Sequence, residues 1–163
     1  MTRRFLLGTA ALCAALFCAM TPAAAQDRET PYWASLRANE IFMRVGPGQN
    51  YRIEWVYRRV HLPVKVLRVK EGWRFVEDVD GTQGWMSAPL LKADRTAIVI
   101  GTGLAVIRDG PGRGGKVQWK AEPGVVGTLG ECDQGWCEFG AFGKDGRERN
   151  GWISADRIWG DGD

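Results

Sequence analysis

The stretch Gly-Trp-Met-Ser-Ala at residues 84–88 decides the fold, because it recurs as Gly-Trp-Ile-Ser-Ala at residues 151–155, 67 residues later. Two other landmarks recur in the same order, at offsets of 64 and 63 residues: Arg-Val-Gly-Pro-Gly at 44–48 as Arg-Asp-Gly-Pro-Gly at 108–112, and Gly-Trp at 72–73 as Gly-Trp at 135–136. Three landmarks in register predict two copies of one unit of about 60 residues. The extra residues of the second copy fall in 140–150, where we expect a loop rich in Gly and charge.

Both copies consist of short strands. Runs of β-branched and aromatic residues between Gly, Pro and Asp-Gly turn signals predict the strands of the first copy, over 41–45, 54–59, 64–69, 73–76 and 84–86. A strand over 96–100 leads into the second copy, with strands expected over 104–108, 125–132, 136–142 and 151–154. The alternation slips at Leu67, which indicates a bulge, and Pro89 fits one helical turn over 87–91.

An all-β fold follows from this spacing. Beyond residue 25, no window of 11 or more residues keeps a helical periodicity. Five or six short strands in each copy indicate a small barrel, so we predict two tandem barrels, over 32–93 and 94–159. The linker over 91–96 is too short for a flexible tether, and we expect the barrels to be fixed relative to each other.

The first 25 residues predict a secretory signal peptide. Arg3 and Arg4 precede an apolar run from Phe5 to Met20, and three alanines at 23–25 favour cleavage before Gln26. The alternative, a membrane anchor, is disfavoured because the run has about 16 residues and a bilayer needs about 20. The residues before Cys13 and Cys18 do not fit a lipoprotein site. We therefore expect a periplasmic protein without stable membrane insertion.

Two cysteines remain beyond the leader, Cys132 and Cys137, and they flank a turn-like Asp-Gln-Gly-Trp stretch. Opposed side chains across a tight hairpin approach the distance that a disulfide needs. The Cys-x4-Cys spacing, with no histidine nearby, disfavours redox chemistry and metal binding. A structural disulfide is favoured, with free thiols as the alternative.

The charge balance argues against nucleic acid as a partner. Without Arg3 and Arg4 the chain carries 20 Lys and Arg against 19 Asp and Glu. A net charge of +1 gives little reason to expect binding to polyanions, which depends on many phosphate contacts.

The sequence also offers few residues in patterns typical of catalytic sites. The phosphate-loop spacing at 110–116 is followed by Val117 where a hydroxyl is required, and His61 is the only imidazole of the chain. The carboxylates at 77–80 border a turn, and we interpret them as solvated. We predict no catalytic residue, metal or cofactor, while an enzyme with an unrecognised site is kept as a third hypothesis.

A family resemblance rests on motifs of the first copy: Arg-Val-Gly-Pro-Gly at 44–48, Trp-Val-Tyr at 55–57, Leu-Pro-Val-Lys-Val at 62–66, Gly-Trp-Arg at 72–74 and Gly-Thr-Gln-Gly-Trp at 81–85. With these motifs the chain resembles the bacterial SH3 (SH3b-like) family, and more narrowly the exported proteobacterial proteins with two such modules. The resemblance covers about residues 32–159. The second copy departs from it at Asp109, at Val117-Gln118-Trp119, which we match to Trp55-Val56-Tyr57, and at its cysteine pair.

The resemblance implies a five- or six-stranded barrel and a binding role at the cell envelope. We expect a shallow groove between the loop after Gly48 and the Gly81 region, which binds cell-wall peptidoglycan or peptide. Candidate ligand-binding residues are the aromatics Tyr51, Trp55, Tyr57, Trp73 and Trp85, with Arg58 and Arg59 for acidic groups. Most aromatic residues are nevertheless expected in the barrel cores. The alternative function is a periplasmic protein–protein adaptor that binds another envelope protein.

Overall fold

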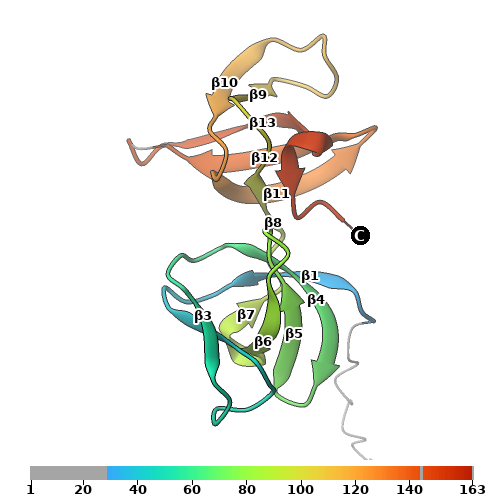
Figure 1. Ribbon diagram of the computed structural model, residues 1–163. Helices are drawn as coiled ribbons and strands as arrows, with labels where there is room; N and C mark the ends of the chain where they lie inside the picture. Colours follow the sequence, from blue (N-terminus) through green and yellow to red (C-terminus); the bar gives the residue numbers. More distant parts are fainter. Residues whose placement is uncertain (1–28, 144, 163) are drawn as a thin grey trace, which may run out of the picture.

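The computed structural model describes residues 29–143 and 145–162, and Figure 1 shows two barrels one above the other. The predicted signal peptide, residues 1–25, lies outside the described residues. The elements of barrel 1 are β1 (Tyr32–Leu36), β2 (Ile41–Arg44), β3 (Ile53–Tyr57), β4 (Pro63–Lys70), β5 (Trp73–Glu77), β6 (Gln83–Ser87), the 3-10 helix η1 (Ala88–Leu90) and β7 (Leu91–Lys92). The elements of barrel 2 are β8 (Thr96–Val99), β9 (Ala105–Arg108), β10 (Val117–Ala121), β11 (Val126–Asp133), β12 (Trp136–Phe142), β13 (Glu148–Ser154), the 3-10 helix η2 (Ala155–Arg157) and β14 (Ile158–Trp159).

The two sheets have the same topology, which confirms the fold predicted from the repeat. The strand order is β3-β2-β6-β5-β4-β1-β7 in barrel 1 and β10-β9-β13-β12-β11-β8-β14 in barrel 2. The bulge expected at Leu67 is present as a shift in register between Val66 and Arg68. The helical turn expected around Pro89 is η1.

The expected loop over 140–150 is wrong in its extent. β12 and β13 stay paired as far as Phe142 and Glu148, so the extra residues lengthen a hairpin. Pairing is favoured there because each added residue satisfies backbone groups that a loop would leave to water. Among the described residues of the tip, Gly143 and Gly146 donate backbone hydrogen bonds to the carbonyl oxygens of Arg147 and Gly143, and Gly146 has a φ of 73°.

Aliphatic side chains and Phe139 fill the two cores. The most deeply buried side chains include Leu36, Ile41, Met43 and Met86 in barrel 1, and Ile107, Phe139 and Ile153 in barrel 2. The expectation that most aromatics are buried is wrong for tryptophan, since none of the eight Trp residues, all of them described, is fully buried. A barrel this small has an interior that suits branched aliphatic residues better than an indole.

Several contacts join the barrels. The Arg59 guanidinium donates a hydrogen bond from Nη1 to the Gly124 carbonyl oxygen, at 2.8 Å. The rings of Trp33 and Trp159 meet edge to face with centroids 4.6 Å apart. At Gly160, an added Cβ would lie 3.3 Å from the Pro63 side chain of barrel 1 and 2.4 Å from the Thr96 carbonyl oxygen of barrel 2, so glycine permits this close approach. These contacts support the fixed arrangement expected from the short linker, which stays a prediction about motion in solution.

Candidate functional site

An open groove lies between β3 and the β5–β6 turn of barrel 1, and we name it the Trp55 groove. Its volume is about 380 Å³. It is lined by Trp55, Tyr57, Leu62, Pro63, Asp78, Val79, Asp80 and Thr82 of barrel 1 and by Ile98 of barrel 2. Because Ile98 belongs to β8, the second barrel closes one side of the first barrel's groove.

Trp55 is exposed because of its position in the sheet. β3 is an edge strand, and Trp55 and Tyr57 stand opposite Met43 and Ile41 of β2. The two aromatics therefore share the face of the hairpin that carries buried side chains. Tyr57 is buried, but 57% of Trp55 remains exposed. Tryptophan is among the residue types enriched at binding hot spots, so an exposed indole beside a groove is a candidate anchor for a ligand.

The opposite wall is held by Asp78, which is 8% exposed. Its carboxylate accepts hydrogen bonds from the Tyr57 hydroxyl at 2.5 Å and from the backbone N–H groups of Asp80 at 3.0 Å and Thr82 at 2.8 Å. Burial, and then the hydrogen bond to Asp78, raises the pKa of the Tyr57 phenol above its ordinary value, so the phenol stays protonated. The interpretation of the 77–80 carboxylates as solvated is therefore wrong for Asp78. It fails because the Asp-x-Asp-Gly turn folds its first carboxylate inward onto a buried phenol.

Asp78→Ala is expected to lower the free energy of unfolding by about 2–3 kcal/mol. The change leaves the buried Tyr57 hydroxyl without an acceptor and removes two hydrogen bonds that shape the turn. Asp80→Ala is the matched control, and because Asp80 is exposed its effect should stay within about 0.5 kcal/mol. Urea denaturation of both variants measures the difference, and equal losses would show that the pair does not hold the turn.

Barrel 2 carries a groove at the equivalent place with different chemistry. The strand pairs Met43–Trp55 and Ile41–Tyr57 correspond to Ile107–Trp119 and Ala105–Ala121. Trp119 thus takes the place of Trp55, and the match of Val117-Gln118-Trp119 to Trp55-Val56-Tyr57 is wrong by two residues. Both tripeptides begin with a hydrophobic residue and end with an aromatic one, so they look equivalent in the sequence, whereas strand register fixes which residues face inward.

The Tyr–Asp pair of barrel 1 is replaced by two alanines in barrel 2, Ala121 and Ala141. The groove there, which we name the Trp119 groove, has a volume of about 500 Å³. Trp119 is partly buried, stacks on Phe139 at a centroid distance of 6.2 Å, and donates its Nε1–H to the Asn150 carbonyl oxygen at 3.2 Å. It is therefore less available to a ligand than Trp55.

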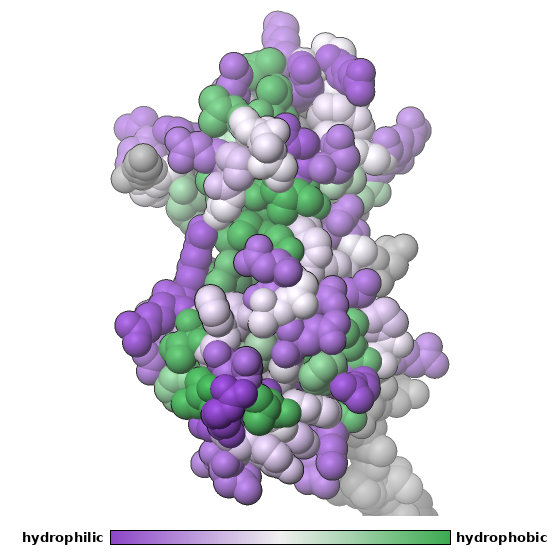
Figure 2. All heavy atoms as spheres, viewed as in Figure 1, coloured by the Kyte–Doolittle hydropathy of each residue, from purple (hydrophilic) through white to green (hydrophobic). Residues whose placement is uncertain are grey.

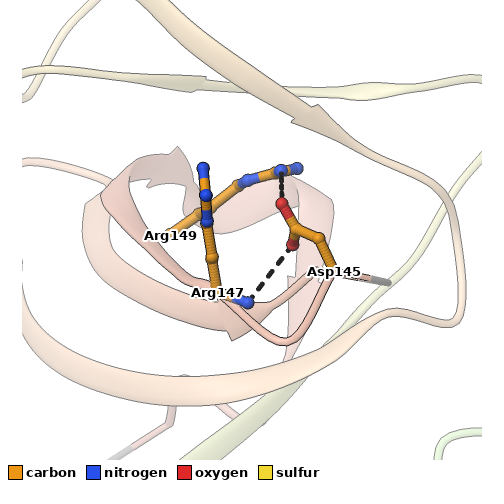
Figure 3. Close-up of polar contacts among 3 residues, drawn as sticks. All are labelled: Asp145, Arg147 and Arg149. Atoms are coloured by element: carbon orange, nitrogen blue, oxygen red, sulfur yellow. Dashed lines mark hydrogen bonds and ion pairs between the residues drawn. The ribbon is translucent and has the colours of Figure 1, made fainter.

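Gly143, Asp145 and Arg149, near the end of the β12–β13 hairpin, line one side of the Trp119 groove. Asp145 accepts a hydrogen bond from the Arg147 backbone N–H at 3.2 Å and forms an ion pair with Arg149 at 2.8 Å (Figure 3). All three residues are exposed, so the ion pair orders the tip and adds little to stability.

The structure separates the other predicted site residues from the Trp55 groove. Tyr51 packs on the Gly-Pro-Gly turn, where a Cβ at Gly46 would lie 2.4 Å from its ring. Trp73 and Trp85 lie on the outward face of β5 and β6, and Trp85 packs on Phe75 at 5.3 Å.

The two arginines proposed for acidic groups have partners within the chain. Arg58 lies 3.6 Å from the Glu40 carboxylate, and Arg59 binds the Gly124 carbonyl of barrel 2. The structure thus brings Trp55 and Tyr57 together beside the Gly81 turn and places the other five predicted residues elsewhere. That any of the seven binds a ligand stays a prediction. Asp78 and Ile98 were missed, although the turn signal at Asp80-Gly81 marks the wall to which Asp78 belongs.

Cys132 and Cys137 stand opposite each other in the β11–β12 hairpin, with their sulfurs at the bonding distance of 2.05 Å. Reduction is expected to lower the free energy of unfolding by about 2 kcal/mol, because the bridge closes a short loop in the unfolded chain. Thermal denaturation of the protein beginning at Gln26, with and without a thiol reductant, measures this. Two titratable thiols in the unfolded, unreduced protein would contradict the bridge.

Two kinds of site are absent from the part of the chain that the structure describes. Within residues 29–143 and 145–162, no three His, Cys, Asp or Glu side chains gather where they could hold a metal ion. The same residues contain no helix with the length and hydrophobicity needed to span a bilayer.

Comparisons with known proteins complete the description. The sequence model of the bacterial SH3 domain matches residues 37–92 and again residues 102–160. Two solved structures are similar, NlpC2 and NlpC1 from Trichomonas vaginalis, at 15% and 17% identity, each with a TM-score of 0.34. They match 82% and 83% of this chain, which spans 49% and 48% of their lengths, and at these scores the likeness supports no statement about function. A search of the curated proteins finds no match.

Proposed function

The chain belongs to the bacterial SH3 domain family, and from that membership we propose that it is a non-enzymatic, exported module that binds cell-wall peptidoglycan or peptide through the Trp55 groove. The observation that carries the proposal is the 57% exposure of Trp55 beside a wall fixed by Asp78. The disulfide supports a location of the protein outside the cytoplasm, because disulfides persist in oxidising compartments, whereas the cytoplasm keeps thiols reduced.

The groove's chemistry suits a peptide. The Trp55 indole offers a flat apolar surface, and Leu62, Pro63 and Ile98 extend it. Asp78 and Asp80 make the groove acidic, and no Lys or Arg is among its described lining residues. A peptide that carries a free amine and short aliphatic side chains, as cell-wall peptides do, matches both features.

Co-sedimentation with purified peptidoglycan sacculi tests the proposal. We expect the protein beginning at Gln26 to be retained at low and at physiological salt, above a neutral control protein of similar size. Soluble fragments released from the sacculi are measured in the same samples, and a non-enzymatic module should release none. Absence of retention at low salt and high protein concentration would overturn the proposal.

A second function, binding to another envelope protein, is favoured by one surface. Figure 2 shows hydrophobic residues gathered on the lower barrel on the side where β3 lies. The exposed apolar residues of the β2–β3 hairpin include Phe42, Val45, Ile53 and Val56, each at least 36% exposed. Since β3 is an edge strand, a partner could add a strand beside it. Capture of one periplasmic protein without binding to sacculi would favour this function.

A further inference from the structure

The outward faces of the two barrels occupy equivalent positions but carry different side chains. In barrel 1, Phe75 pairs with Trp85 and Glu77 pairs with Gln83. The equivalent pairs in barrel 2 are Glu138 with Trp152 and Gly140 with Asn150. The tryptophan is present in both copies, and its surroundings have changed.

The face of barrel 1 is occupied by its own side chains. The Arg68 guanidinium lies 4.1 Å from the centroid of the Phe75 ring and 5.8 Å from that of the Trp85 ring, so it covers both aromatics. Beside them, Gln83 donates a hydrogen bond from Nε2 to Glu77 at 2.5 Å. The polar and aromatic groups of this face therefore satisfy one another.

The same face of barrel 2 is open. Glu138 replaces the ring of Phe75, and Gly140 has no side chain where Glu77 stands in barrel 1. A groove of about 480 Å³ results, within the size range of small-ligand sites. We name it the outer groove, and its lining includes the polar side chains of Asp109, Gln118, Thr128, Glu138 and Asn150 together with Trp152.

The floor of the outer groove is closely fitted. A Cβ at Gly140 would lie 2.3 Å from Oδ1 of Asn150 and 2.8 Å from Oγ1 of Thr128. Thr128 donates a hydrogen bond to the Gly140 carbonyl oxygen at 3.2 Å, and Asp109 accepts one from the Lys116 backbone N–H at 2.8 Å. The Asn150 amide thus lies over Gly140, and contacts within barrel 2 hold the polar groups around the groove in place.

We propose that the outer groove binds a neutral glycan chain. Amide, hydroxyl and carboxylate groups around an indole can donate to and accept from sugar hydroxyls, while the indole packs on the apolar side of a sugar ring. Among the described residues no cation forms an ion pair with Glu138, so its carboxylate can accept hydroxyl hydrogen bonds. Two carboxylates disfavour an anionic ligand. No Lys or Arg is among the described lining residues of the outer groove, so an anionic ligand would find no charge partner there.

The outer groove is made of other residues than the Trp55 groove. This proposal rests on the proposed function only for the source of the glycan, which is the sugar strands of the cell wall. A neutral tetramer of β-linked N-acetylglucosamine is the probe, added to the protein beginning at Gln26 and followed by calorimetry. The intact protein is expected to bind it. Trp152→Ala should weaken binding by on the order of tenfold or more. Trp85→Ala, the same change at the equivalent position of barrel 1, should leave the affinity unchanged.

A second variant keeps the test independent of Trp152. Glu138→Phe puts back the ring that closes this face in barrel 1 and should also remove binding, while the melting temperature shows that the barrel is folded. Three results would overturn the proposal: no binding by the intact protein, equal weakening by Trp85→Ala and Trp152→Ala, or displacement of the tetramer by a lysine peptide. In each of these cases the protein would still be retained on sacculi through the Trp55 groove. The outer-groove proposal can therefore fail while the proposed function stands, and the two experiments tell the failures apart.

Discussion

Trp55→Ala is expected to lower the affinity of the protein for sacculi by on the order of 30-fold, because central aromatic anchors contribute about 2 kcal/mol or more to binding. With 57% of its surface exposed, Trp55 is free to contact a ligand. Its indole also lines the Trp55 groove, beside Leu62, Pro63 and Ile98. Co-sedimentation over a range of protein concentrations measures the change.

The matched control is Trp85→Ala, which removes an indole of equal size from the outward face of the same barrel. Because Trp85 lies against Phe75 and under Arg68, retention should stay within about twofold of the intact protein. Melting temperatures of both variants show that the barrel is intact. Equal loss of retention in the two variants would show that the Trp55 groove is not the site.

Phe139→Ala is expected to lower the free energy of unfolding by about 3–5 kcal/mol. The side chain is 1% exposed and is among the largest fully buried side chains of the described residues. Its ring lies against Gly127, where a Cβ would come within 2.6 Å of it, so the backbone at Gly127 is fitted to this ring. Truncation leaves a cavity that the strands around it cannot close.

Phe142→Ala, three residues along the same strand, is the control for that change. Phe142 is 72% exposed, so its truncation should alter stability by no more than about 0.5 kcal/mol. Guanidinium denaturation of the two variants gives the comparison. A loss below about 1 kcal/mol for Phe139→Ala would contradict a core built around this ring.

The repeat was sufficient to predict the fold. Three landmarks recur at nearly one offset, which predicts two copies of one unit. Gly and Pro turns between short runs of β-branched residues predict that each unit consists of short strands. The positions of the tryptophans were not predictable in the same way. Gly84-Trp85 and Gly151-Trp152 put glycine on the inward face and the indole on the outward face, and only strand register shows which is which.

The candidate site was predictable in part. Trp55 and Tyr57 stand out in the sequence as alternating aromatics, and Asp80-Gly81 marks the turn opposite them. The role of Asp78 depends on a hydrogen bond to a residue 21 positions away, which no local pattern reveals. The contribution of Ile98 depends on how the second barrel sits against the first.

The most direct test of ligand binding at the Trp55 groove is backbone NMR of the protein beginning at Gln26, titrated with a soluble cell-wall peptide. Shifts are expected at the amide signals of residues 55–57, of Leu62, of residues 78–82 and of Ile98, which belong to the four segments that line the groove. Shifts confined to barrel 2 or to the outward face of β5 and β6, with these segments unchanged, would contradict it.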